Sequence, residues 1–166
     1  MSRAEEYLLV IGIFQGTLLF ALLCLDSRSS TASRILGLLC LLMASAFLMP
    51  FLQLSDRSAL QILAGVMFCF PAAGGGLAFL YCRSALLGSV LKPRDSLLFL
   101  PWLGCQLLTA DFTFSDPGAM LRWINGAPAS SWRLQAAEYL LFAQAFGFAA
   151  ATIRMTWCYR RQASAT

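Results

Sequence analysis

The sequence predicts an all-α protein, a polytopic transmembrane helical bundle of about five spans that forms a single membrane domain over residues 1–166. Composition is the first observation: 59% of the residues are hydrophobic and 12% are charged, against roughly 45–50% and about 25% in soluble domains. The second is that the apolar residues gather in five long runs, each close to the roughly 20 residues that cross a bilayer. With a mean hydropathy of +0.71, so short a chain needs a bilayer to accept its apolar surface.

The first two predicted spans cover residues 8–25 and 35–54. The first follows acidic Glu5 and Glu6 and ends at an Asp-Ser-Arg sequence, without a positive leading segment or a small-residue cleavage site. It therefore predicts an uncleaved span rather than a signal peptide. A polar Ser/Thr/Arg linker precedes the second span, and Ser55-Asp56-Arg57 closes it.

The remaining predicted spans cover residues 59–82, 96–114 and 134–159. The third contains a proline and a glycine triplet and ends at Arg83, the fourth follows a basic loop, and the fifth stops at a pair of arginines. Residues 113–133 predict an exterior loop rich in proline and glycine. Its apolar middle predicts a short helix lying on the membrane interface, with Trp123 and Trp132 as anchors.

Basic residues orient the bundle, since Lys and Arg accumulate on the cytoplasmic side of a membrane. With five spans, one side carries eight of them: Arg28, Arg34, Arg83, Lys92, Arg94, Arg154, Arg160 and Arg161. The other side carries four: Arg3, Arg57, Arg122 and Arg133. The sequence therefore predicts the N-terminus outside and the C-terminus in the cytoplasm.

Several classes of protein lose support from what is absent from the sequence. The chain has no histidine, and its six cysteines are single, with no C-x-x-C pair, so we expect no metal and no cofactor. Phosphate-loop, zinc-protease and hydrolase motifs are also missing. We expect that the chain is not an enzyme.

Candidate ligand-binding residues begin in the third span, where Pro71 precedes Gly74, Gly75 and Gly76. Proline removes a backbone donor and glycine bends easily, so the helix is expected to kink or partly unwind there. Freed backbone groups in a membrane must face protein or a cavity, as in discontinuous helices that bind ligands. The alternative is that the glycines let a neighbouring helix approach closely.

Polar side chains inside spans are the other candidates for ligand binding, because they are costly in a bilayer. They are Gln15, Gln106, Asp111, Glu138 and Gln144. Together with Arg133, Asp111 and Glu138 predict the rim of an outward-facing pocket for a small polar ligand. Solvated boundary residues or a local ion pair are the alternative.

Small residues at a spacing of four mark two predicted helix-packing faces. Gly12 and Gly16 lie in the first span, and Ala143, Gly147 and Ala151 lie in the fifth. Such faces pack helices closely, either within one subunit or between the two copies of a homodimer.

Three segments resemble the membrane-embedded N-terminal half of bacterial AraC-type transcriptional regulators. They are Leu-Val-Ile-Gly-Ile-Phe-Gln-Gly at 9–16, Leu-Ala-Phe-Leu-Tyr-Cys-Arg-Ser at 77–84 after Pro71, and Leu-Phe-Leu-Pro-Trp at 98–102. The resemblance implies a multi-pass sensor in the bacterial inner membrane that passes a signal to a cytoplasmic helix-turn-helix domain.

The sequence departs from that family in two respects. A glycine triplet replaces the Gly-Pro pair of the third span, and the later spans and the DNA-binding half are missing. We therefore expect no direct nucleic-acid binding by this chain, and a cytoplasmic regulatory partner as its output. A truncated regulator, a separated sensor and a degenerate paralogue remain open.

The leading hypothesis is thus a signal-sensing domain that lacks its own output domain and has the lipid bilayer as its surroundings. A small transporter is the alternative, favoured by the broken third span and the interior glutamines. The absence of a midplane charge and of an inverted repeat disfavours it. A membrane enzyme would depend on Asp111, Glu138 or a lone cysteine, and nothing in the sequence activates them.

Overall fold

The computed structural model describes residues 3–25, 29–53 and 57–163. In chain order the elements are α1 (Arg3–Leu25), α2 (Thr31–Gln53), α3 (Ser58–Phe68), α4 (Pro71–Leu87), the 3-10 helix η1 (Pro93–Phe99), α5 (Leu100–Ser115), α6 (Pro117–Ile124) and α7 (Trp132–Ala163). All secondary structure in this described part is helical, which confirms the predicted fold class.

Five helical segments are long and apolar enough to cross a membrane, as predicted. They are Ala4–Leu25, Thr31–Gln53, Ser58–Leu87, Pro93–Ser115 and Trp132–Arg161. The third continues past residue 82, where we ended it, and stops at Leu87 because Gly88 adopts a left-handed C-cap, with its amide donating to the Ser84 carbonyl. The charge of Arg83 is paired with Asp95. Leu54, the predicted end of the second span, lies outside the described residues.

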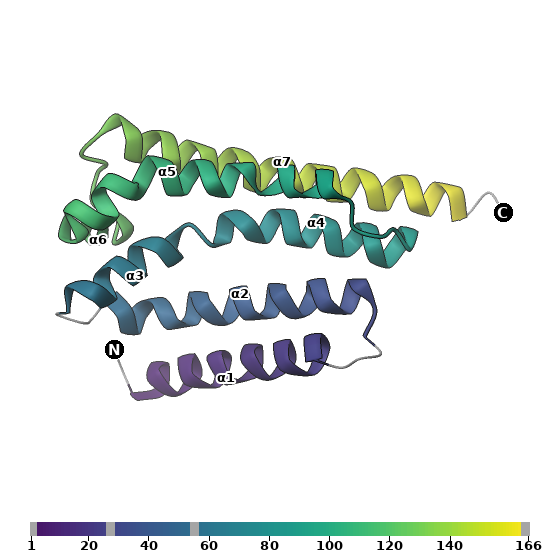
Figure 1. The fold of residues 1–166 in the computed structure, drawn as a ribbon, viewed down its shortest axis with the longest axis horizontal. Helices are drawn as coiled ribbons and strands as arrows, with labels where there is room; N and C mark the ends of the chain where they lie inside the picture. Colours follow the sequence, from purple (N-terminus) through teal and green to yellow (C-terminus); the bar gives the residue numbers. More distant parts are fainter. Residues whose placement is uncertain (1–2, 26–28, 54–56, 164–166) are drawn as a thin grey trace.

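The long helices run back and forth in layers (Figure 1). α1 packs against α2, α2 packs against α3 and α4, and α7 packs against α4 and α5. The third span therefore lies between α2 on one side and α5 with α7 on the other. This central position makes any irregularity in the third span an internal feature of the bundle.

The alternating directions sort the connecting segments into two opposite ends (Figure 1). The start of α1, the end of α2, the start of α3 and α6 lie at one end. The end of α1, the start of α2, the α4–η1 connection and the end of α7 lie at the other. These are the two sets of segments to which we assigned four and eight basic residues, although Arg28 falls outside the described residues.

The predicted exterior loop differs from the structure at two points. α5 continues through Ser115, so the connection begins later than residue 113. The expected short helix forms as α6, but Trp123 is 8% exposed, and its ring lies 5.1 Å from that of Phe68. The prediction of Trp123 as an interface anchor is wrong, because α6 packs into the bundle against α3 and α5. Trp132, in contrast, is exposed.

Candidate functional site

The third span breaks just before Pro71. Proline has no N–H to continue the helix, and the Phe70 amide donates instead to the Met67 carbonyl at 3.0 Å. Pro71 then begins α4. The predicted break is therefore present, but the expected unwinding at Gly74, Gly75 and Gly76 is wrong, because these residues lie within the regular helix α4.

Gln106 of α5 satisfies a backbone group at this break. Because the Phe70 amide has turned to Met67, the Val66 carbonyl lacks the donor that a continuous helix would supply. The Gln106 side-chain Nε2 donates to that carbonyl at 2.8 Å. Gln106, predicted as a ligand-binding residue, thus acts as a structural cap in this structure.

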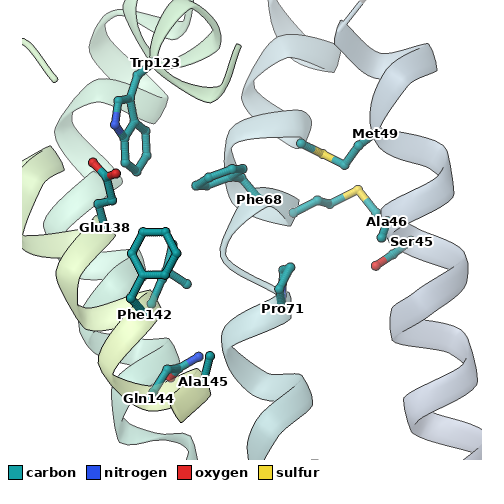
Figure 2. Close-up of a pocket in the computed structure, with 12 residues that line it drawn as sticks. Ser45, Ala46, Met49, Phe68, Pro71, Trp123, Glu138, Phe142, Gln144 and Ala145 are labelled. Carbon is teal, nitrogen blue, oxygen red and sulfur yellow. The ribbon is translucent and has the colours of Figure 1, made fainter. Parts of the chain in front are cut away.

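A cavity of about 460 Å³ lies beside the break. Figure 2 shows its walls: α2 contributes Ser45 and Met49, the break contributes Phe68 and Pro71, and α6 contributes Trp123. α7 closes the remaining side. The cavity is within the size range of small-molecule sites, and its lining comes from four separate segments of the chain.

α7 provides the two polar side chains of this cavity that were predicted as ligand-binding residues, Glu138 and Gln144. Glu138 lies near Trp123, and Gln144 lies toward the other end (Figure 2). Gln144 is 9% exposed, and its Oε1 has no hydrogen-bond partner among the described residues. A buried amide oxygen without a donor is costly, so Gln144 is an unfavourable residue for a purely structural wall of the cavity.

The cavity is open at the molecular surface. Glu138, Phe142 and Ala145 line it and are also exposed. They lie on the apolar span formed by α7, so in a bilayer this opening faces lipid rather than water.

A second proline lies in α2, which forms the opposite wall. Pro50 lies inside α2 and has no N–H, so the carbonyl of Ala46, four residues earlier, loses its helical donor. Ala46 lines the cavity. The α2 wall of the cavity therefore lies one helical turn before a proline.

The other predicted ligand residues lie elsewhere. Asp111 forms an ion pair with Arg133, which agrees with the alternative reading of a local pair, and neither residue lines the cavity. A Cβ on Gly75 would lie 2.6 Å from the Phe148 ring, and one on Gly76 would lie 3.3 Å from the Leu98 carbonyl. The glycine triplet thus gives close helix packing.

The two stripes of small residues differ in their surroundings. A Cβ on Gly16 would lie 2.7 Å from the Ala44 Cβ, and one on Gly12 would lie 2.8 Å from the Phe47 ring. The first stripe therefore packs α1 on α2 within the chain. The stripe on α7 is open, since a Cβ on Gly147 would meet no atom within 4 Å, and a homodimer through it stays a prediction.

An ion pair joins α4 to η1 at the opposite end of the bundle. The Arg83 guanidinium donates to both carboxylate oxygens of Asp95, at 2.8 Å and 2.5 Å. The Lys92 amide donates to the same carboxylate at 2.7 Å. This bidentate arrangement fixes the start of η1 against the end of α4.

Sequence reasoning missed the aromatic and α2 residues of the cavity. Phe142 follows Glu138 by one helical turn, a spacing that places both side chains on one face of the helix. This spacing could have predicted from the sequence that Phe142 lies beside Glu138. Trp123 and Met49 come from segments distant in the sequence, and no local pattern joins them to α7. Among the described residues, no group of three acidic, His or Cys side chains is placed to hold a metal ion.

The fold provides five helical segments that are long and apolar enough to cross a membrane, the pattern of a multi-pass helical membrane protein, and a cavity beside an interrupted central helix. Comparisons with protein-family models, with curated proteins and with solved structures found no match for this chain.

Proposed function

We propose that the chain is a signal-sensing domain of the bacterial inner membrane, and that the cavity beside the α3–α4 break receives the signal. The observation that carries this proposal is a largely apolar cavity, lined by the polar side chains of Glu138 and Gln144, next to an interrupted helix. Discontinuous membrane helices build ligand sites in this way. The resemblance of residues 9–16, 77–84 and 98–102 to membrane-bound AraC-type regulators supports the same function.

α7 is the element that connects the cavity to an output. It supplies Glu138, Phe142 and Gln144 to the cavity and continues as one helix to Ala163. With the N-terminus outside and the C-terminus inside, as the basic residues favour, a shift of α7 on ligand binding reaches the cytoplasm. There it acts on a regulatory partner, and this chain has no direct contact with nucleic acid.

Transcript profiling in the native host tests the sensor function. A deletion strain is complemented with the wild-type gene, with Ala145→Trp, which fills the cavity, or with Ala150→Trp. Ala150 is exposed on the same helix and does not line the cavity. We expect the deletion to change the expression of a defined set of genes, Ala150→Trp to restore it, and Ala145→Trp to fail. Unchanged transcripts in the deletion strain would refute the proposal.

A small transporter is the second candidate, because an interrupted helix beside a cavity is also a feature of transporters. Solute flux into proteoliposomes that contain the purified chain separates the two functions. Flux that Ala145→Trp abolishes and Ala150→Trp preserves would favour transport. A transcriptional response without flux would favour sensing.

A further inference from the structure

The charge within the cavity is unbalanced. Glu138 is the one ionisable side chain among the described residues that line the cavity. No described residue forms an ion pair with it, and Arg133, five residues earlier on α7, pairs with Asp111. A carboxylate against apolar walls is unfavourable unless a positive charge accompanies it. The cavity therefore favours a ligand that brings a cation.

Aromatic side chains surround the same end of the cavity. Phe68, Trp123 and Phe142 all line it, and Figure 2 shows them around the space next to Glu138. The Phe68 and Trp123 rings meet edge to face, at an interplanar angle of 65°. Aromatic rings attract cations electrostatically, and several rings together form the cages that recognise quaternary ammonium groups. An anionic ligand would gain nothing from these groups.

The rest of the cavity suits an apolar body with one further polar contact. Gln144 follows Glu138 by six positions on α7, which is roughly 9 Å along a helix axis. Met49 and Pro71 line the intervening space. Gln144 lines the far end of the cavity and adds a polar amide group there. Because the opening is lipid-facing, a ligand that partitions into the bilayer has direct access.

We propose that the cavity binds a hydrophobic cation, a molecule with one ammonium-type positive charge on an apolar body. The charge lies at Glu138 among the three aromatic rings, and the body extends along α7 toward Gln144. The inference names the ligand class for the proposed sensor and rests on that function for its biological meaning.

Binding of a pair of probe ions tests the proposal. Tetraphenylphosphonium and tetraphenylborate have nearly the same size and shape and opposite charge. Equilibrium dialysis measures radiolabelled tetraphenylphosphonium on the full chain in nanodiscs, with empty nanodiscs subtracted because the ion also enters lipid. We expect saturable binding that unlabelled tetraphenylphosphonium displaces and tetraphenylborate does not. No saturable binding above empty nanodiscs, or equal displacement by both ions, would overturn the proposal.

Variants of Glu138 test whether its carboxylate is the group that binds the positive charge of the ligand. We expect Glu138→Gln to weaken binding by about tenfold, the loss of one charge contact, and Glu138→Asp to keep the preference for the cation. Glu6→Gln is the matched control, since Glu6 is exposed in the first turn of α1 and does not line the cavity. Circular dichroism and size-exclusion elution show that each variant is folded. Wild-type affinity in folded Glu138→Gln would overturn the assignment of the charge.

The binding and transcript experiments fail independently of each other. If probe binding is absent while Ala145→Trp still abolishes the transcript response, the cation inference is wrong and the sensor function stands. If the cation binds at Glu138 and deletion leaves all transcripts unchanged, the ligand class stands and the sensor function is wrong.

Discussion

Replacing Gln106 tests how the interrupted third span is stabilised. Gln106→Leu removes the donor that lies 2.8 Å from the Val66 carbonyl and leaves that carbonyl without its partner. Water cannot replace the bond inside a bilayer, so the backbone group stays unsatisfied. We expect the variant to be less stable than the wild type.

The size of the effect follows from two limits. An orphaned buried acceptor costs about 1–3 kcal/mol in soluble proteins. Side-chain hydrogen bonds between membrane helices contribute about 0.6 kcal/mol on average and about 1.7 kcal/mol at most, because the unfolded chain also finds partners. The short distance and the lost helical donor place Gln106 near the upper end of the second range. We expect a loss of about 1–2 kcal/mol in the free energy of unfolding.

Unfolding in mixed micelles with increasing dodecyl sulfate, followed by circular dichroism, gives this free energy. Gln15→Leu is the matched control, since Gln15 is exposed on α1 and its side chain forms no hydrogen bond with the described residues. Hydrogen exchange at residues 66–70 supplies a local measurement and should become faster only in Gln106→Leu. Equal free energies for the two variants, with unchanged exchange at 66–70, would refute the capping role.

Three further predictions concern packing, charge and orientation. Gly16→Ala should lower the free energy of unfolding by about 1–3 kcal/mol, because the new Cβ would lie 2.7 Å from the Ala44 Cβ of α2. Gly147→Ala should have little effect on the free energy of unfolding, because a Cβ there would meet no atom within 4 Å. In a double-mutant cycle of Arg83→Gln and Asp95→Asn, the coupling free energy should be favourable, about 0.5–1 kcal/mol, and should fall with added salt. No coupling at low salt would contradict a stabilising role for this ion pair. Reporter fusions should show alkaline phosphatase activity after residue 126 and cytoplasmic fluorescence after residue 161, and the reverse pattern would disprove the orientation.

Part of the candidate site could be predicted from the sequence. Pro71, Glu138 and Gln144 stood out because proline and polar side chains are costly inside a membrane helix. The same criterion also selected Gln106 and Asp111, because it measures the cost of a polar group and not the partner that offsets it. Gln106 meets a backbone carbonyl and Asp111 meets Arg133, and neither partner is visible in a local pattern.

The sequence by itself determined the helical class and the five apolar segments, because the bilayer requires each span to satisfy its own backbone and to present apolar side chains. It also placed a break near Pro71, since proline lacks the N–H that a helix needs. Only the tertiary structure decided which helices lie side by side. Helix neighbours in a membrane are selected by shape and by small residues rather than by hydrophobicity, so the meeting of Trp123, Phe68 and Glu138 around one cavity depends on the packing of α6 and α7 against the interrupted third span.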